Sequence, residues 1–421
     1  MKILILGLNY APEPVGIGPY TTGMAEFLAQ AGHQVSVVCG KAYYPHWRLH
    51  EDHRARGVLT SAENGVRVNR VPIYVPEKPN GLRRLLHHIS FAASAGPVMA
   101  REAWRARPDM VICIAPSLIS TVVARAASFL TRAKLWLHIQ DFEVEAAFAT
   151  GLLKDGGLLA SAARAFERWS LKATRISTIS PQMCAKLRRA NVPSARVVEF
   201  RNWANIDHVR PLDTPSSYRE IWDIKTPYVA LYSGNIGNKQ GIEIIVEVAR
   251  LLRHRDDITF IICGNGAMRE TLVEAARDLT NVRFPDLQPM EMMSQMLGLA
   301  TVHLLPQIGG AADLVLPSKL TNMLASGRPV VATAEAHTGL AKEVQGCGLV
   351  VPPENAPAFA AAVETLLGDE ALRREYGQAA RARAEERWSK PRILHDFELA
   401  LRDSVIEGVA KPAGQPILEK S

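Results

Sequence analysis

A serine and a lysine at the start of a short predicted helix carry the clearest chemical signal in this chain. Residues 315–333 read VLPSKLTNMLASGRPVVAT, which predicts a strand end, a turn at Pro317, a short helix and a buried strand. Ser318 is a favourable N-cap, Lys319 follows in the first turn, and Gly327 is typical of a helix end. Free N–H groups, a hydroxyl and an ammonium together form an anion site, such as one for phosphate. The alternative is a well-capped connection in which Lys319 is only solvated.

A second glycine-rich turn with a cation follows another predicted strand. Residues 232–243 read YSGNIGNKQGIE, in which Gly234 and Gly237 open the turn and Lys239 supplies a positive charge. Gly241 then begins a helix. Because glycines let backbone N–H groups approach a ligand, we interpret this loop as a second phosphate-binding turn. The alternative is a loop lysine in solvent.

The first predicted strand is followed by a loop whose glycines come late. Residues 8–23 read LNYAPEPVGIGPYTTG, and Gly16 and Gly18 lie behind two prolines. This spacing differs from the tight GxGxxG turn of dinucleotide-binding folds, which disfavours a hydride-transfer enzyme. A longer loop can still bring backbone N–H groups to a phosphate. The alternative is a plain loop in which glycine only permits a positive φ.

A histidine lies near the end of the fourth predicted strand. Residues 137–143 read LHIQDFE, with His138 at the carboxyl end of the strand and Asp141 on the loop that follows. Sites of α/β proteins are built at this end of the sheet, which favours a functional role for His138. The alternative is a histidine whose ring is satisfied by nearby protein groups.

These residues sit among short apolar runs that alternate with helical segments. The runs are ILILGLNY, VSVVCG, MVICIAP and KLWLHIQ in the first half, and YVALYSG, ITFIICG, TVHLLPQ and PVVATAE in the second. Apolar strands separated by helices predict parallel sheets covered on both faces. We therefore expect an α/β fold of two Rossmann-like, doubly wound domains, with ligands in a cleft at the carboxyl ends of the strands.

A chain of 421 residues is too long for one ordinary core, so two domains are expected. The polar, proline-containing segment 202–226 predicts their junction. We expect an N-terminal domain at 1–205, a C-terminal domain at 206–385, and a helix and tail at 386–421 that return toward the N-terminal domain.

Composition favours a cytoplasmic protein. The chain has five widely spread cysteines and no CxxC pair, namely Cys39, Cys113, Cys184, Cys263 and Cys347. This pattern indicates reduced, buried thiols and neither a disulfide framework nor a zinc site. The opening run MKILILG is too short for a signal peptide, and no stretch approaches the ~20 apolar residues of a membrane-spanning helix.

Charge is unevenly divided along the chain. Residues 1–205 hold 26 Lys and Arg against 14 Asp and Glu, and residues 206–421 hold 23 against 28, giving +12 and −5 within the total of +7. A basic half favours an anionic partner, and sparse aromatics disfavour nucleic acid, which leaves an anionic membrane surface.

One predicted helix has the composition that such a surface would require. Residues 81–96 read GLRRLLHHISFAASAG, with apolar residues at helical spacing and Arg83 and Arg84 among them. The segment predicts either an ordinary helix packed on the sheet or a helix lying on the inner face of the cytoplasmic membrane.

No DxD pair occurs in the chain. Without clustered carboxylates, an Mg²⁺ or Mn²⁺ ion bridging a diphosphate is not expected, and neither is any other cofactor. Protein cations and helix N-termini would then have to stabilise the charge of a leaving phosphate.

Taken in order, these motifs resemble those of GT-B glycosyltransferases of the retaining family 4 type, over almost the whole chain. The matching motifs are VGIG at 15–18, LAQAGHQVSVV at 28–38, His138, RNWANID at 201–207, SGNIGNKQG at 233–241 and LPSKLTNMLASGRPVVAT at 316–333. The last two are similar to a WcaI-like and WbuB-like subgroup that synthesises bacterial surface polysaccharides, including colanic acid.

The chain departs from the family pattern in the second half. The family commonly has an Arg and a Lys in the second-domain loop where this chain has Asn235 and Gln240, and Lys239 is one position away. The second of the family's paired glutamates falls at Asn322. The first has no clear match, and Asp313 is the nearest acid.

The resemblance implies a nucleotide-diphosphate sugar as donor substrate, bound mainly to the second domain. Its base would lie against the backbone at Asp286–Leu287, after Gly264, and its sugar near Asp313 and Asn322. Amides, cations and one hydroxyl would hold the departing diphosphate, namely those of Gly16, Gly18, Gly234, Asn235, Lys239, Ser318 and Lys319.

The resemblance also implies how the sugar moves. An acceptor hydroxyl would attack from the leaving-group face, which retains the anomeric configuration, while His138 positions the donor sugar. Domain closure would exclude water. The acceptor would bind the first domain, and a polyprenyl-diphosphate-linked saccharide would suit its positive charge.

Two other functions stay open at the level of sequence. One is a nucleotide-sugar epimerase of the same architecture, which would need acid/base carboxylates in the cleft. The other is a non-catalytic, membrane-associated protein that binds nucleotide sugars.

Overall fold

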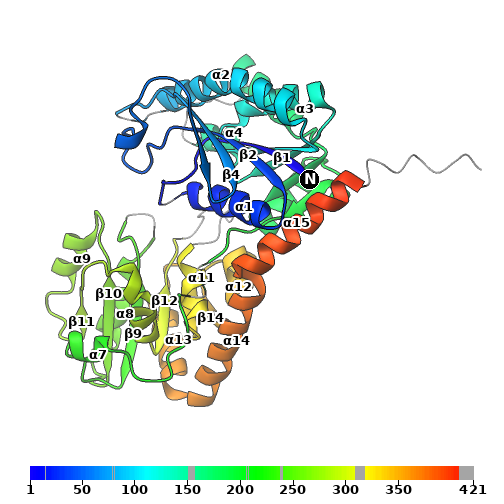
Figure 1. The fold of residues 1–421 in the computed structure, drawn as a ribbon. Helices are drawn as coiled ribbons and strands as arrows, with labels where there is room; N and C mark the ends of the chain where they lie inside the picture. The colour runs from blue at the N-terminus through cyan, green and yellow to red at the C-terminus, as the bar shows by residue number, and fades with distance from the viewer. Residues whose placement is uncertain are drawn as a thin grey trace, which may run out of the picture. The chain divides into compact units, whose positions relative to one another are not determined.

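The computed structural model describes residues 1–14, 16–77, 79, 81–149, 157–204, 206, 208–237, 240–308 and 318–406. The chain divides into two compact units. The first unit comprises Met1–Phe200 together with Leu394–Ser421, and the second comprises Arg201–Ile393. Each unit contains one sheet with its own helices (Figure 1).

The first unit alternates strands and helices from its first residue. Its strands are β1 (Lys2–Gly7), β2 (Gln34–Gly40), β3 (Leu59–Glu63), β4 (Val66–Val71), β5 (Met110–Ala115), β6 (Lys134–Ile139), β7 (Arg175–Thr178) and β8 (Val197–Glu199). Its helices are α1 (Gly18–Gln30), α2 (Gly81–Ala106), α3 (Thr121–Thr131), α4 (Glu143–Ala149), α5 (Leu158–Ser170) and α6 (Pro181–Arg189). Short 3₁₀ turns lie at Glu51–His53, Leu118–Ser120 and Ser194–Arg196.

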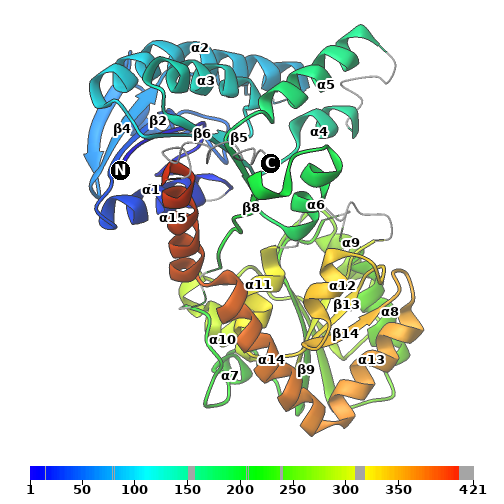
Figure 2. The same ribbon diagram turned by 90° about the vertical axis from the view of Figure 1, so that its right-hand side faces the viewer.

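The eight strands of the first unit form one sheet in the order β3-β4-β2-β1-β5-β6-β7-β8. All neighbouring strands are parallel except β3 and β4, which form an antiparallel pair at the edge. Helices α2 and α3 lie side by side over one face, and α1 lies on the other (Figure 2). Strands buried on both faces are apolar, and β5 reads MVICIA whereas β1 reads ILILG after its exposed first residue, Lys2.

The last helix, α15 (Lys390–Ile406), contributes its end to the first unit. Phe397 stacks on Phe200 with ring centroids 4.0 Å apart, and it meets the edge of Trp136 at 5.1 Å. Glu398 Oε1 lies 2.9 Å from His33 Nε2. Aromatic packing and a buried polar pair therefore anchor residues from the C-terminal part of the chain to the N-terminal sheet.

The second unit repeats the alternation. Its strands are β9 (Tyr228–Ser233), β10 (Ile258–Cys263), β11 (Val282–Arg283), β12 (Val302–Leu305), β13 (Val330–Thr333) and β14 (Gly348–Val351). Its helices are α7 (Tyr218–Ile221), α8 (Glu243–Leu251), α9 (Arg269–Ala275), α10 (Met293–Gly298), α11 (Ser318–Ala325), α12 (Gly339–Val344), α13 (Ala356–Gly368) and α14 (Glu370–Trp388), with a 3₁₀ turn at Met290–Met292.

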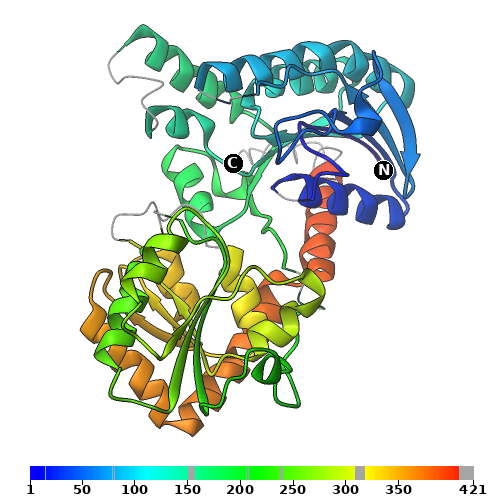
Figure 3. The same cartoon turned by 90° about the vertical axis from the view of Figure 1, so that its left-hand side faces the viewer.

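The sheet of the second unit has the order β11-β10-β9-β12-β13-β14, and its pairs are parallel. Helices cover both of its faces (Figure 3). Side chains of β9 alternate between two cores, because Val229 and Leu231 pack toward α11 and α14 whereas Ala230 and Tyr232 pack toward α8 and α13. The predicted fold class, two doubly wound parallel sheets, is confirmed.

Several short strands were missing from the sequence prediction. The β3–β4 pair lies at the edge of its sheet, and β7, β8, β11 and β14 have only two to four residues each. Runs of two to four residues give no period of their own, so pairing with a neighbouring strand decides them.

Gly348 shows how tightly β13 and β14 approach. A Cβ added to Gly348 would lie 1.9 Å from the carbonyl oxygen of Val330 on the neighbouring strand. We expect Gly348→Ala to lower the free energy of unfolding by about 3 kcal/mol, since the backbone has to shift to admit the methyl group. Urea denaturation of the full chain measures the change.

Gly368 provides the matched control, because a Cβ there meets no atom within 4 Å. It ends α13, and Gly368→Ala should leave stability unchanged or raise it by about 0.5 kcal/mol. Equal effects of the two substitutions would contradict the close approach.

Candidate functional site

Two loops of the second unit meet at the carboxyl ends of their strands. The N–H of Gly234, after β9, donates to the carbonyl of Cys263 at 3.0 Å, and the N–H of Ile236 donates to that of Asn265 at 2.9 Å. A Cβ on Gly264 would lie 2.0 Å from the carbonyl oxygen of Gly234. The glycine therefore permits direct contact between two backbones, and this contact fixes the shape of the loop.

Lys319, in the first turn of α11, extends over this loop. Its ammonium donates to the hydroxyl of Tyr232 at 2.7 Å and lies 4.4 Å from the centre of the tyrosine ring. A Cβ on Gly234 would lie 3.5 Å from the same nitrogen. The lysine predicted at the helix start and the glycine predicted in the second loop are thus neighbours.

Tyr232 holds the ammonium and the loop together. Its hydroxyl accepts from Lys319 and donates to the carbonyl of Asn235 at 2.7 Å. Burial raises the pKa of Tyr232 well above its usual value, so the phenol stays neutral and can donate. From the sequence, Tyr232 is only one residue of a buried strand, because nothing local marks its contact with a lysine 87 positions away.

The charge of Lys319 is poorly compensated. Burial lowers the pKa of its side chain to about 8, because a low-dielectric environment disfavours the charged form. Among the described residues no carboxylate forms an ion pair with it. A cation in this position, beside a helix N-terminus and a glycine-rich loop, is suited to bind an anion.

The other predicted site residues of the second unit lie on α11 and after β10. Ser318 begins α11, and Asn322 lies one turn after Lys319 on the same helix. The carbonyl of Asp286 accepts from Cys263 Sγ at 3.3 Å, next to Gly264, and the neighbouring Leu287 is 66 % exposed. The resemblance places the nucleotide base against this segment, next to the end of β10.

Three of the predicted site groups lie outside the residues that the structure describes. They are Lys239, Asp313 and the side-chain hydroxyl of Ser318. Their roles stay predictions.

In the first unit, an acid that sequence reasoning overlooked fixes the loop after β1. The carboxylate of Glu13 is buried and accepts from the N–H groups of Tyr43 and Tyr44 at 2.9 and 3.0 Å. The Asn9 amide also donates to it at 2.8 Å. Burial raises the pKa of Glu13, and these three donors oppose that rise. The carboxylate thus ties the loop after β1 to the loop after β2.

The two glycines of the loop after β1 lie close to Tyr44 and Glu13. Gly16 has φ +73°, and a Cβ there would lie 3.1 Å from the ring of Tyr44. A Cβ on Gly18, which begins α1, would lie 3.0 Å from the Cβ of Glu13. Both glycines are required by local packing, and contact of their amides with a phosphate stays a prediction.

His138 lies inside β6, which ends at Ile139, and its side chain is buried. Its Nδ1 donates to Ser177 Oγ at 2.9 Å, and its Nε2 accepts from the Gln140 amide at 3.0 Å. Burial lowers the pKa of His138 to about 3, so the ring is neutral. Nearby protein groups thus satisfy both ring nitrogens of His138, which was the alternative to a functional role. Contact with a donor sugar would require these bonds to rearrange. Gln140 and Asp141 are the residues that follow the strand.

Two protein-family models together match most of the chain. A glycosyl transferase 4-like domain matches residues 15–203, and a model of glycosyl transferases group 1 matches residues 216–383. The chain belongs to this family of glycosyltransferases, as the motifs had predicted. It is therefore an enzyme, and neither the epimerase nor the non-catalytic alternative is supported.

Among individual relatives, the chain is 39 % identical over 409 residues to WcaI of Escherichia coli K12. The name of that protein describes it as a glycosyl transferase of colanic acid biosynthesis. The match covers 94 % of this chain and 98 % of that protein. An alpha-D-kanosaminyltransferase of Streptomyces kanamyceticus is 30 % identical over 200 residues, or 46 % of this chain and 50 % of its own length.

Solved structures support the GT-B fold. Sucrose-phosphate synthase of Thermosynechococcus elongatus superposes with a TM-score of 0.71 at 18 % identity, covering 97 % of this chain and 100 % of the other. WaaG, a glycosyltransferase involved in lipopolysaccharide biosynthesis, gives 0.62 at 18 % identity over 94 % and 99 % of the two chains.

The buried state of Lys319 predicts a pH dependence of folding. Its pKa of about 8 in the folded chain is below the ordinary value of 10.5, so between these values the unfolded chain binds more protons and stability rises with pH. We expect the free energy of unfolding of the wild type, minus that of Lys319→Met, to rise from about pH 8 to about pH 10. Urea titrations at successive pH values measure it.

The subtraction removes the contributions of the other lysines, which titrate in both proteins. A difference that stays constant across this range would mean that the ammonium is solvated in the folded chain.

Proposed function

We propose that this glycosyltransferase moves a sugar from a nucleotide-diphosphate sugar to a saccharide acceptor, with retention of configuration and without a metal ion. The observation that carries the proposal is the ammonium of Lys319, partly buried above Gly234 at the N-terminus of α11. A diphosphate placed there would supply the negative charge that the described surroundings of the lysine lack.

The proposed chemistry relies on stabilising the leaving group. As the bond from the sugar to the diphosphate breaks, negative charge accumulates on the phosphate oxygens, and donors already in place stabilise it most. Lys319 and the first N–H groups of α11 are such donors. Tyr232 orients the ammonium and needs no charge change to do so. The acceptor hydroxyl then attacks from the same face and passes its proton toward the departing phosphate.

We further propose that the product belongs to a bacterial surface polysaccharide and that the acceptor is lipid-linked. The likeness to the colanic acid protein over 94 % of the chain supports the pathway. The surface of α2 supports the lipid, because one row of its exposed side chains is apolar.

One exposed face of α2 is apolar along nearly the whole helix. The exposed residues at spacings of three and four are Leu82, Leu86, Ile89, Ala93, Pro97, Ala100 and Trp104. At 1.5 Å per residue this row is about 33 Å long. The leucines predicted at 81–96 are thus largely exposed, with Leu82 at 62 % and Leu86 at 47 %, and only one face of the helix packs on the sheet.

The apolar row continues onto α3. Trp104 and Leu130 line the same surface hollow together with Arg107 and Arg132. Trp104, Phe129 and Leu130 are 82 %, 84 % and 68 % exposed. Apolar side chains bordered by arginines are typical of segments that lie in the interface of an anionic bilayer. In the described residues, no helix is long and apolar enough to span a membrane.

Replacing Lys319 tests the catalytic proposal. We expect Lys319→Ala to reduce transfer at least about 100-fold, the scale on which loss of one transition-state donor acts. Release of free nucleotide diphosphate from a panel of nucleotide sugars, with a lipid-linked acceptor, measures turnover. Unchanged circular dichroism would show that the variant folds.

Lys342→Ala is the matched control, because Lys342 is an exposed lysine on α12 of the same unit. It should retain wild-type turnover. Near-wild-type transfer by Lys319→Ala would rule out the phosphate contact.

Charge placed in the apolar row tests membrane binding. We expect Leu86→Glu with Ile89→Glu to reduce cosedimentation with phosphatidylglycerol vesicles at least about tenfold, because both side chains would otherwise be buried in the interface. Replacing Arg83 and Arg84 by Gln should weaken the salt-sensitive part of binding.

Val273→Glu, at a 40 % exposed position on α9 of the other unit, should bind vesicles as the wild type does. Binding that is absent in the wild type, or unchanged in the double glutamate variant, would refute the membrane assignment.

A further inference from the structure

We propose that the second unit has another anion site, which binds a small phosphorylated metabolite at the edge of the sheet opposite Lys319. A cavity of about 850 Å³ lies there. Its walls include Tyr228 at the start of β9, Thr301 before β12 and Pro329 before β13. In a parallel sheet all strands begin at one edge, so this cavity is separate from the loops after β9 and β10.

Arginine dominates the charge of the cavity. Five arginines and three acidic residues line it, an excess of two positive charges. Two of the acids are already paired, since Arg374 contacts Glu370 at 3.0 Å and Arg381 contacts Glu385 at 2.7 Å. The remaining lining charges are Arg219, Arg328, Arg373 and Asp213.

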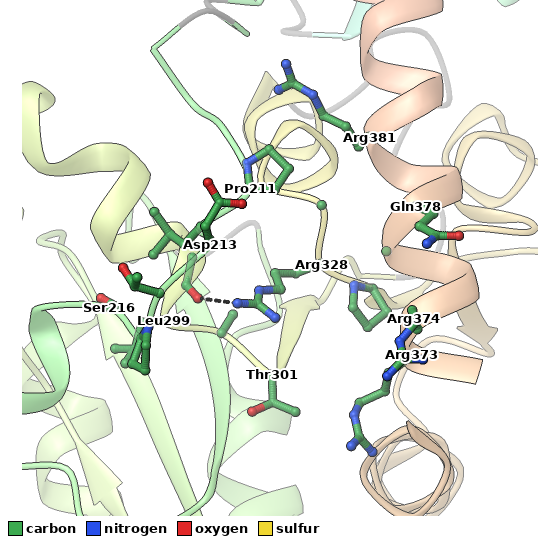
Figure 4. A pocket seen from close by; sticks show the side chains of 18 of the residues that line it. Pro211, Asp213, Ser216, Leu299, Thr301, Arg328, Arg373, Arg374, Gln378 and Arg381 are labelled. Carbon is green, nitrogen blue, oxygen red and sulfur yellow. Dashed lines mark hydrogen bonds between the residues drawn. The ribbon is translucent and has the colours of Figure 1, made fainter. Parts of the chain in front are cut away.

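Arg328 is the central cation (Figure 4). Its Nη2 donates to the carbonyl of Gly298 at 3.1 Å, the bond drawn in Figure 4. Burial, and secondarily the charge of Arg219, lower the pKa of Arg328. Within the described residues no carboxylate pairs with either guanidinium. Two neighbouring positive charges in a hollow repel each other unless an anion lies between them.

Arg219 and Arg373 are held in place by backbone carbonyls. Arg219 donates to the carbonyls of Thr226 and Pro227, each at 2.8 Å. Arg373 donates to the carbonyls of Leu366 and Leu367 at 2.7 and 2.6 Å. These bonds fix the orientation of the guanidinium groups without neutralising them, so their charge remains available to a ligand.

The walls of the cavity are closely packed. A Cβ on Gly298 would lie 2.4 Å from Leu212 Cδ1, and one on Gly377 would lie 2.4 Å from the carbonyl oxygen of Gly327. The 211–216 segment is therefore in close contact with the end of α10, and α14 with the turn after α11. A preformed hollow with arginines and apolar walls fits a molecule with a phosphate group on a carbon skeleton.

Helix α11 lies between the two anion-binding regions. Lys319 is in its first turn, and Gly327, Arg328 and Pro329 follow its last residue, Ala325. The eight residues of the helix span about 12 Å. Binding of an anion to the cavity can thus be measured in a variant in which Lys319 has been replaced.

The test uses inorganic pyrophosphate as the probe and isothermal titration calorimetry of the full chain carrying Lys319→Ala. This background weakens the expected donor site, and the proposal predicts that saturable binding remains. Ala382, exposed on α14 and part of the cavity wall, then receives a carboxylate. We expect Ala382→Glu to weaken pyrophosphate binding at least about tenfold through like-charge repulsion, whereas Ala382→Gln should leave it unchanged.

Neither substitution removes a hydrogen bond of the folded chain, and a melting curve for each verifies folding. Hydrogen exchange provides a local readout, with protection by pyrophosphate expected at 211–216 and 298–301. The site is refuted if Lys319→Ala shows no saturable binding, if the Glu and Gln variants bind equally, or if sodium chloride at the same ionic strength reproduces the heat.

Discussion

Direct backbone contact between the loops after β9 and β10 is the constraint on which the candidate site depends. Gly264 has φ +142° and leaves no room for a side chain beside the carbonyl of Gly234. With the two loops in contact, Tyr232 can reach both the Asn235 carbonyl and the Lys319 ammonium. A side chain at position 264 would separate the loops, and the ammonium would lose its support although the lysine itself were unchanged.

Electrostatics gives the second unit two distinct cationic regions. At the carboxyl ends of the strands, one lysine is desolvated beside a helix N-terminus. Where the strands begin, arginines are oriented by backbone carbonyls around a preformed hollow. Hydrogen bonds to uncharged groups orient Lys319, Arg219 and Arg328, and in the described part of the chain no carboxylate pairs with these three, so they retain charge for a ligand.

The first unit uses its chemistry differently. Glu13 and His138 are buried and satisfied by protein groups, and both shape the loops at the carboxyl ends of β1 and β6. A row of exposed apolar residues instead follows α2 and continues onto α3. A helix that is apolar on two opposite faces can pack on a sheet with one and contact lipid with the other.

Local sequence determined the parallel sheets, the helix that starts at Ser318, the end of that helix near Gly327, and the family. These features follow from apolar runs, caps and turn residues, which act over a few positions. Tertiary structure decided the rest. His138 bonds to Ser177 on the neighbouring strand, and Glu13 accepts from an N–H group 30 positions away. The arginine cavity is lined by five separate segments of the chain. Burial and partners of such side chains depend on which elements pack together, and no spacing along the chain encodes that.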